Sequence, residues 1–288
     1  MSIIGAGAVG TTLAVMLHRR GFPIVSVISR HRTSARRCAE LVSCPQYSTT
    51  LKRLAGETDL LVIAVPDEEI RSVARHLSSR VDVDFRGLKV FHTSGSLTSA
   101  ELYPLRRRGA LTFSLHPMQT FPASLTTRLQ LQSMKGISYG VEGTRRSIPF
   151  AVSLVRSLGG KIFVVPKKEK ISYHLACVLA SNYPIALLAA VEEVVARFVR
   201  PPRLRHFERL IETSIQNALD HRPQRALTGP IARGSMRIVE AHMQVLRRRS
   251  SLRSVYRALG IYAVELSRRA GRLTRKQSQA LKEMLSKT

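Results

Sequence analysis

Residues 2–10 of the 288-residue chain, Ser-Ile-Ile-Gly-Ala-Gly-Ala-Val-Gly, read as a short apolar strand that runs into a G-x-G-x-x-G turn. A helical pattern over residues 11–20 follows the turn, and a second apolar strand follows at residues 24–28. This order of strand, turn, helix and strand is the context that a dinucleotide-binding fingerprint requires, and the motif without it is weak evidence. The stretch therefore predicts a dinucleotide site, with a plain glycine-rich turn as the alternative.

Each glycine of this turn has its own mechanical task. Gly5 allows the tight turn out of the strand, Gly7 lets a pyrophosphate approach the backbone, and Gly10 lets the helix pack closely on the sheet. The helix N-terminus adds free N–H groups and a partial positive charge. We therefore expect the dinucleotide to contact Gly5, Ala6, Gly7, Ala8, Val9 and Gly10.

The end of the second strand predicts which dinucleotide binds. An NAD-specific site needs a carboxylate about 20 residues after the glycines, to bind the ribose 2′-hydroxyl. This sequence has none there, and Ser29, Arg30, His31 and Arg32 follow the strand. A hydroxyl and two guanidinium groups match a 2′-phosphate, so we expect NADP, with Ser29, Arg30 and Arg32 as its ligands. In the alternative interpretation, the two arginines are only solvated.

Strands continue to alternate with helices as far as residue 165. Further apolar strands are expected at residues 60–65, 88–91, 110–115, 136–141 and 161–165. The alternation predicts an α/β fold, with a doubly wound parallel Rossmann sheet followed by an all-α C-terminal domain. We place the NADP-binding domain at residues 1–165 and the helical substrate and dimerisation domain at residues 166–288.

Polar residues follow several of these strands, at the edge of the sheet where such folds bind ligands. Val65 ends one strand and Pro66 follows it, and both are expected to contact the cofactor. Asp67 is the expected N-cap of the next helix. Ser94 follows another strand, and we expect it to donate hydrogen bonds near the nicotinamide or the substrate. His116 follows a third strand and is a candidate proton donor, because imidazole titrates near neutrality. A structural histidine bonded to a loop carbonyl is the alternative for His116.

The longest apolar stretch lies within a predicted helix over residues 171–199. It contains Asn182 and Pro184, so we expect a core helix rather than a membrane span. His174 and Ser181 lie two helical turns apart on one face, and Asn182 flanks that face. Polar groups on a buried helix are costly unless they are paired. These side chains therefore need either a ligand or one another.

Composition limits the classes of function. The chain carries 46 Lys and Arg residues against 19 Asp and Glu residues, a net charge of +27. This excess is spread through both halves, whereas a nucleic-acid arm or a membrane anchor would concentrate it. We expect anionic ligands, no membrane and no metal, and we consider nucleic acid the lesser alternative. Three cysteines without a C-x-x-C pair fit a reducing compartment, so we expect the cytoplasm.

Combined, the motifs resemble those of the Rossmann-like proteins that carry a DUF2520 domain. This group belongs with pyrroline-5-carboxylate reductases, F420-dependent NADP oxidoreductases and 6-phosphogluconate dehydrogenase-like enzymes. The resemblance covers roughly residues 2–265. The motifs that carry it are His92-Thr93-Ser94-Gly95, Ser114-Leu115-His116-Pro117-Met118-Gln119-Thr120-Phe121, Tyr173-His174, Ala180-Ser181-Asn182-Tyr183 and Ala226-Leu227-Thr228-Gly229-Pro230-Ile231-x-Arg233-Gly234.

The resemblance implies an NADP-binding domain, a helical C-terminal domain and a homodimer formed through those helices, but it implies no substrate. It favours a role for Ser181 and Asn182 in the pocket. One departure is Ser235, where the family's loop places an aspartate. We expect an NADP-dependent oxidoreductase that acts on a small, anionic C=O or C=N substrate, with an NADP-binding sensor without turnover as the alternative. Its expected pocket residues are Ser94, His116, His174, Ser181 and Asn182.

Overall fold

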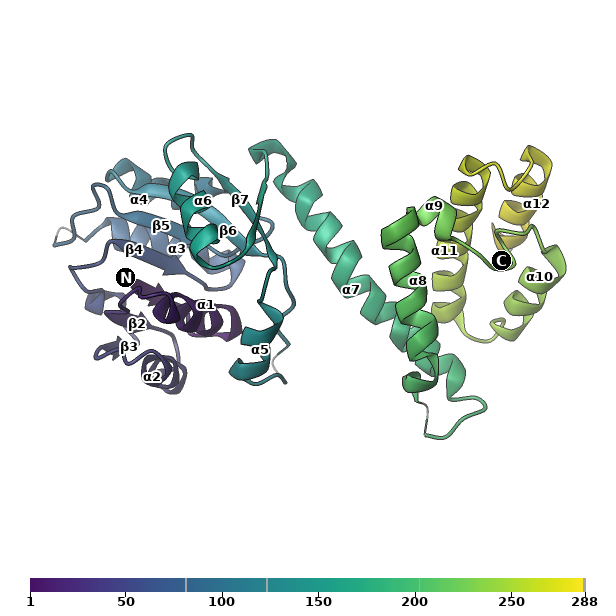
Figure 1. The fold of residues 1–288 in the computed structure, drawn as a ribbon, viewed down its shortest axis with the longest axis horizontal. Helices are drawn as coiled ribbons and strands as arrows, with labels where there is room; N and C mark the ends of the chain where they lie inside the picture. The colour runs from purple at the N-terminus through teal and green to yellow at the C-terminus, as the bar shows by residue number, and fades with distance from the viewer. Residues whose placement is uncertain (81, 123, 202, 287–288) are drawn as a thin grey trace. The chain divides into compact units, whose positions relative to one another are not determined.

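The computed structural model describes residues 1–80, 82–122, 124–201 and 203–286. Its first part is built on one eight-stranded sheet with the strand order β3-β2-β1-β4-β5-β6-β7-β8 (Figure 1). The strands are β1 (Ser2–Ile4), β2 (Ser26–Ile28), β3 (Tyr47–Ser48), β4 (Leu60–Ile63), β5 (Lys89–His92), β6 (Leu111–Pro117), β7 (Ser138–Gly143) and β8 (Lys161–Val164). The predicted doubly wound Rossmann sheet is confirmed, with one antiparallel pair, β6 and β7.

Helices cover both faces of this sheet. The cluster on one face contains residues of α1, α2 and α6, and the cluster on the other contains residues of α3 and α4. Because both faces are covered, β4 at the centre of the sheet is buried throughout and apolar on both sides. The helices of this part are α1 (Ala8–Arg19), α2 (Arg32–Leu41), α3 (Asp67–Ser78), α4 (Tyr103–Arg107), α5 (Thr127–Ser133) and α6 (Ile148–Ser157).

The glycine turn joins β1 to α1 with almost no free space. Gly5 has a φ of +98°, a conformation that L side chains rarely adopt. A Cβ on Gly10 would stand 1.8 Å from the Gly5 carbonyl oxygen, so α1 can seat only with glycine at this position. Gly7 differs, because no atom lies within 4 Å of where its Cβ would stand. The turn is therefore closed toward the sheet at Gly10 and open at Gly7.

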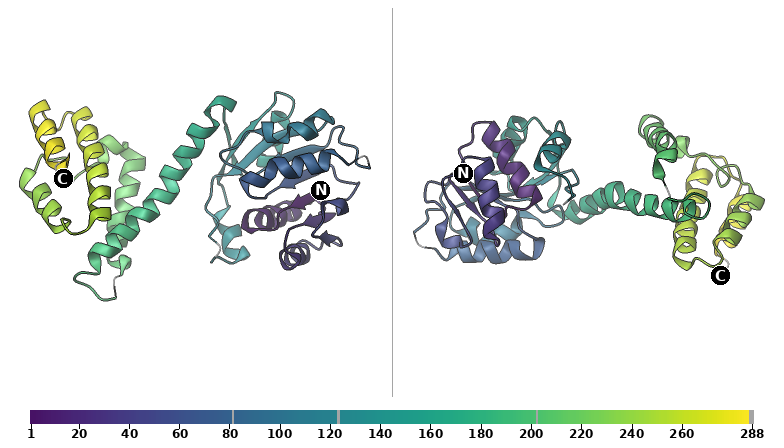
Figure 2. Two further views of the ribbon diagram at one scale, coloured as in Figure 1. Left: turned by 180° about the vertical axis from the view of Figure 1, so that it is seen from behind. Right: turned by 90° about the horizontal axis from the view of Figure 1, so that it is seen from below.

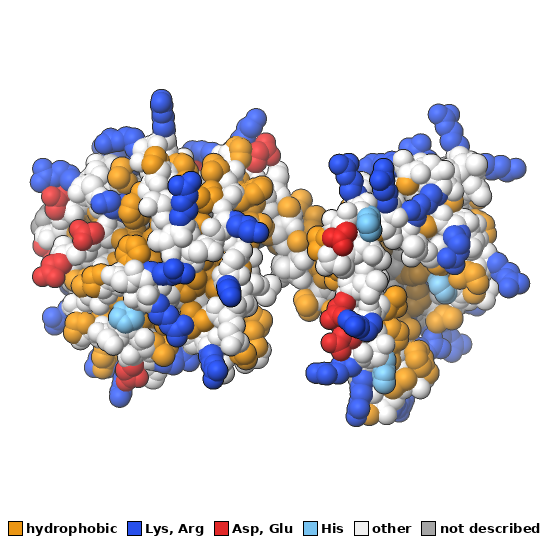
Figure 3. All heavy atoms as spheres, viewed as in Figure 1, with side chains coloured by type: hydrophobic (Ala, Val, Ile, Leu, Met, Phe, Trp, Pro, Cys, Tyr) orange, Lys and Arg blue, Asp and Glu red, His pale blue; other side chains and the backbone are white. Residues whose placement is uncertain are grey.

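The rest of the chain is helical, as predicted. Contacts divide the structure into a first unit, Met1–Tyr183, and a second unit, Pro184–Thr288. The division falls within α7, whereas the sequence places the domain boundary just before that helix. Figure 3 shows basic side chains spread over both units. The helices are α7 (Lys170–Val195), α8 (Glu208–His221), α9 (Pro223–Ala226), α10 (Met236–Val245), α11 (Ser250–Arg269) and α12 (Arg275–Ser286).

Helix α7 differs from the predicted core helix. It is one continuous helix through Pro184 (Figure 2), but its apolar side chains are largely exposed. Ile171 and Ile185 are 67% and 66% exposed. The stretch Lys167–Val195 has a mean hydropathy of 1.6 and is long and apolar enough to cross a membrane, a test that core helices of soluble proteins also pass. The apolar composition predicted that the side chains of this helix are buried. In the described structure most of them are exposed.

Candidate functional site

The carboxyl ends of four parallel strands meet at one edge of the sheet. Ile4, Ile63 and His92 end β1, β4 and β5, and they lie in one row with Ser114 of β6. The turns after β1, β4 and β5 are therefore neighbours in space. Strand β6 continues to Pro117, so His116 lies within this strand and does not follow it as predicted. Ligands bind beyond the carboxyl ends of the strands in open α/β sheets, so this edge is where a site is expected.

A groove of about 440 Å³, the glycine-loop groove, opens at this edge. The open backbone at Gly7 and the N-terminus of α1 border it, which is the arrangement that binds a pyrophosphate. The predicted cofactor residues that line the groove are Gly5, Ala6, Gly7, Ser29, Arg30, Val65 and Pro66.

The remaining predicted cofactor residues lie outside the lining of the groove. Ala8, Val9 and Gly10 form the first turn of α1. Arg32 stacks on a ring instead, with its guanidinium carbon 5.4 Å from the centre of the Tyr47 ring. Side chains that the sequence analysis did not name complete the groove. These are His31, Ser34, Thr49 and Glu69, with the apolar residues Ile4, Ile28, Leu51, Ala64 and Val73.

Arg30 is already paired in the groove. Its Nη1 donates to Glu69 Oε1 at 2.7 Å, and both side chains are partly exposed. Glu69 lies in the first turn of α3, where the helix dipole favours a carboxylate. The end of β2 thus has no acidic residue, as the sequence shows, but the fold brings an acidic residue to it from α3.

Asp67 connects the glycine-loop groove to the next turn along the edge. It follows Pro66, which lines the groove, and its Oδ2 accepts hydrogen bonds of 2.7 Å from the hydroxyls of Ser94 and Ser96. The predicted N-cap role of Asp67 is wrong, because Pro66 occupies the N-cap position and Asp67 begins the helix. Ser94 Oγ in turn accepts the backbone N–H groups of Ser96 and Leu97, which fixes the turn. The Ser94 hydroxyl is therefore occupied within the protein.

Two histidines meet at Gly95. A Cβ on Gly95 would stand 2.7 Å from His174 Cδ2 and 3.0 Å from His116 Nε2, so only glycine leaves room for both rings. The two ring centres lie 6.4 Å apart. His116 Nδ1 lies 2.7 Å from the Tyr173 hydroxyl oxygen, and its Nε2 faces Gly95. The structure thus brings together two predicted catalytic residues that lie far apart in the chain.

The environment keeps His116 neutral. Burial, followed by electrostatic repulsion from Lys170 and then His174, lowers the pKa of His116 to about 4. Burial also raises the pKa of the Tyr173 phenol, which therefore keeps its proton. A protonated phenol can donate to His116 Nδ1, which leaves the imidazole proton on Nε2, facing Gly95.

His92, by contrast, is structural. Its Nδ1 accepts the Ser94 N–H at 3.2 Å, and its Nε2 lies 3.0 Å from the Thr98 carbonyl oxygen. Burial lowers the pKa of His92 to about 4, so the ring is neutral with both nitrogens occupied. Its role is to hold the turn that carries Ser94 and Gly95.

A buried lysine lies beneath the two histidines. Lys170 is 1% exposed, and its Nζ donates to Ser114 Oγ at 3.0 Å. Ser114 Oγ lies 3.5 Å from the buried carboxylate of Glu142, which also accepts the Ser99 hydroxyl. Burial lowers the pKa of Lys170 to about 8, while the negative charge of Glu142 opposes the shift. Lysine is almost never fully buried without a partner, and Ser114 with Glu142 supplies one.

Ser181 and Asn182 lie farther along α7 and bond locally. Ser181 Oγ is 2.8 Å from the Cys177 carbonyl oxygen and 2.9 Å from Asn182 Oδ1. Asn182 is exposed. Within the described residues, neither side chain forms a hydrogen bond with His116 or His174. Their predicted place in the pocket stays a prediction.

Lys170 and Glu69 were not predicted as parts of the site. Lys170 had a usable signal, because Tyr173 and His174 follow it three and four residues later, on the same face of a helix. Glu69 had no signal in the sequence, because only the folded chain brings α3 to the end of β2. Ser235, the family departure, is the N-cap residue of α10 but makes no side-chain cap bond.

Two family models match the chain. A Rossmann-like domain matches residues 1–117, and a domain of unknown function, DUF2520, matches residues 137–263. The comparison with curated proteins finds no match.

Solved structures share the architecture. A proposed NADP oxidoreductase from Bacteroides fragilis is 23% identical, with a TM-score of 0.75 over 91% of this chain and 96% of its own. A protein from Thermotoga maritima is 25% identical, with a TM-score of 0.70 over 93% and 98%. A pyrroline-5-carboxylate reductase from Coxiella burnetii is 17% identical, with a TM-score of 0.55 over 100% and 98%. The chain is therefore a two-domain protein in which a Rossmann-like domain is followed by a DUF2520 domain.

Proposed function

We propose that this protein is an NADP-dependent oxidoreductase that transfers a hydride between the nicotinamide and the C=O or C=N carbon of a small, anionic substrate. One observation carries the proposal. The glycine-loop groove and the cluster of Gly95, His116 and His174 lie at the same edge of one sheet, joined through Asp67. A dinucleotide with its pyrophosphate at Gly7 could extend its nicotinamide toward that cluster.

NADP is favoured over NAD by the groups around the expected ribose position. Ser29, Arg30, His31 and Thr49 supply hydroxyls, a guanidinium and an imidazole there. The Bacteroides fragilis neighbour is described as acting with NADP. Glu69 opposes this preference, because its carboxylate occupies Arg30 and would repel a 2′-phosphate. We infer that binding of NADP requires Arg30 to leave Glu69.

NADPH would supply the hydride when it is bound, and the residues of the chain then have to orient the C=O or C=N substrate and handle the proton that the reduced product needs. A neutral His116 with its proton on Nε2 can donate a hydrogen bond to a carbonyl oxygen or an imine nitrogen. Tyr173 holds the ring in this tautomer through Nδ1. Neutral imidazole is a known electrophile in this role, because it polarises the substrate without becoming an imidazolium ion.

Lys170 gives the site a buried positive charge. Its ammonium lowers the proton affinity of His116 and favours negative charge on a substrate nearby. The net charge of +27 acts in the same direction over longer distances, because it attracts anionic ligands. Both observations support an anionic substrate.

We further propose a homodimer that covers α7. Side chains such as Leu175, Leu179 and Tyr183 are more than half exposed along this helix. Exposed apolar surface of this extent marks an interaction site. A second copy of the chain would bury it, and a bilayer is the other environment that could.

The cofactor assignment predicts that NADPH binds more tightly than NADH, by about tenfold, or about 1.4 kcal/mol. Isothermal titration calorimetry on the purified protein measures both affinities. Glu69→Gln should tighten NADPH binding by about threefold, because it removes a like charge beside the 2′-phosphate, and should leave NADH unchanged. Arg30→Gln should weaken the binding of NADPH and leave the binding of NADH unchanged.

Arg36→Gln is the matched control, since Arg36 is also exposed and paired with a glutamate on its own helix. It should change neither affinity. Binding of neither dinucleotide would contradict the oxidoreductase proposal, and equal binding of both would contradict only the NADP preference.

The electrostatic coupling predicts a change in the titration of His116. Replacing Lys170 with methionine should raise the pKa of His116 above about 4 by about one unit, because one of the two charges that lower it is removed while burial remains. The pKa is read from the imidazole proton signals by NMR between pH 3 and 8. Lys167→Met removes an exposed charge nearby and should leave the titration unchanged. An unchanged pKa in Lys170→Met would show that the ammonium does not act on the ring.

The dimer proposal predicts a solution mass of twice the 32.1 kDa chain, measured by light scattering after gel filtration. Leu179→Glu should give a monomer, because it places a charge in the buried interface. Leu129→Glu alters an exposed leucine on α5 and should leave the dimer intact. A monomeric wild-type protein in the absence of detergent, or extraction only with detergent, would contradict the proposal.

A further inference from the structure

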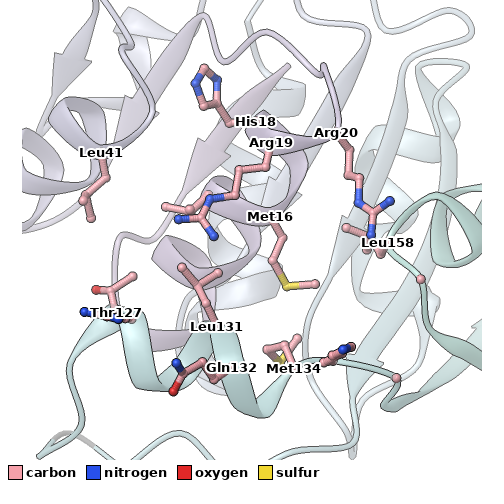
Figure 4. Close-up of a pocket in the computed structure, with 15 residues that line it drawn as sticks. Met16, His18, Arg19, Arg20, Leu41, Thr127, Leu131, Gln132, Met134 and Leu158 are labelled. Carbon is pink, nitrogen blue, oxygen red and sulfur yellow. The ribbon is translucent and has the colours of Figure 1, made fainter.

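A second pocket of the first unit, which we call the rear pocket, lies at the C-terminal end of α1 (Figure 4). Its volume is about 980 Å³, compared with about 440 Å³ for the glycine-loop groove. Helix α1 has 12 residues and is therefore about 18 Å long. The glycine turn lies at the other end of α1, so the rear pocket is separate from the proposed cofactor site.

Buried polar contacts fix the walls of the rear pocket. Helix α5 forms one wall, and its Gln130 accepts a hydrogen bond from Thr12 of α1 at 3.1 Å. Both side chains are buried. Gln130 also donates to the Pro122 carbonyl, and Gln119 donates to the Ser133 carbonyl at the end of α5. These hydrogen bonds therefore fix the position of α5 relative to α1, and with it the space between the two helices.

The floor of the rear pocket is apolar. Met134 and Leu158 belong to the core beneath it, and Met16 and Leu131 pack against that core. Figure 4 shows the Met16 side chain reaching from α1 toward Met134. Flexible methionine side chains adapt to ligands of different shapes. The floor can therefore accept an apolar group.

The rim of the rear pocket is cationic. His18, Arg19 and Arg20 come from α1 and its end, and Arg128 and Lys135 come from α5 and its end. No acidic side chain is among the described residues that line the pocket. Within the described part of the chain, no ion pair involves any of these five side chains, whereas Arg30, Arg36, Arg80 and Arg86 of the first unit each pair with an acidic side chain. Other arginines among the described residues of this unit also have no acidic partner, so the feature of the pocket is that five basic side chains gather around one space.

Arg20 lies against the turn after α6, with its Nη2 3.3 Å from where a Cβ of Gly159 would stand. The basic side chains of α1 and α5 thus border one common space, next to this turn.

We propose that the rear pocket binds an organic anion that carries a phosphate or a carboxylate on an apolar body. The arginines would bind the acidic group, since guanidinium matches both groups with paired hydrogen bonds. The apolar body would lie on the methionine and leucine floor. The volume is at the upper end of the range for small-molecule sites.

Octyl phosphate and octanoate are the probes, and isothermal titration calorimetry on the full chain measures their affinities. Inorganic phosphate tests the acidic group alone, and octanol tests the apolar body alone. At least one of the two amphipathic anions should bind about tenfold more tightly than inorganic phosphate, because both the rim and the floor contribute. The probe that binds more tightly identifies the preferred acidic group, phosphate or carboxylate. Saturation of the protein with that probe should leave its affinity for NADPH unchanged.

The double variant Arg20→Gln/Arg128→Gln should weaken the probe about tenfold. The control Arg36→Gln/Arg86→Gln removes two exposed arginines of the same unit and should not weaken it. Leu131→Gln should weaken the amphipathic probe but not inorganic phosphate, which tests the floor independently. If the control variant weakened probe binding as much as the double variant, general charge attraction would explain the binding and the proposal would be wrong. Failure of both probes to bind would also overturn it, and so would competition between the probe and NADPH.

Discussion

The close seating of α1 on the sheet is the constraint on which the rest of the site depends. Gly10 approaches the Gly5 carbonyl so closely that any side chain would push the helix away. With α1 seated, its N-terminus lies at the carboxyl edge, where the open backbone at Gly7 borders the groove. The same edge carries the turns after β4, β5 and β6. One steric contact thus sets the position of the phosphate site relative to the histidines.

Buried hydrogen bonds connect the turns between the groove and the histidines and fix their relative positions. Asp67 ties the turn after β4 to Ser94 in the turn after β5, and His92 holds that turn from below. Lys170, Ser114 and Glu142 form a second buried set under His116. Such groups are costly when unpaired, so a fully paired set fixes one arrangement. The geometry around Gly95 is therefore set by the protein before any ligand arrives.

The sequence predicted most of the fold because its signals are local. Strand and helix patterns, the glycine turn and the change to helices after residue 165 can all be recognised in short windows. It did not predict β3, which has only two residues, or α5. It predicted burial for α7 from composition, whereas the described residues of the chain leave most of that helix exposed.

The site was only partly predictable, because several of its contacts join residues that lie far apart in the chain. His116 and His174 were named from their positions, and the fold brings them together at Gly95. The pairing of Arg30 with Glu69, and of Lys170 with Ser114, joins residues far apart in the chain. A periodic pattern carries no information about such pairs. The spacing predicts that His174 and Ser181 share one helix face and that Asn182 flanks it, but the hydrogen bonds of Ser181 and Asn182 are local.

The most direct test of the central claim is a crystal structure of the protein with NADP⁺ bound. The account predicts the pyrophosphate against the backbone of Gly7 and the nicotinamide beside Gly95. Its C4 atom should leave space for a substrate carbon about 3–3.5 Å away, within reach of His116 Nε2. A nicotinamide directed away from His116 and His174, or a dinucleotide bound elsewhere on the chain, would contradict the account.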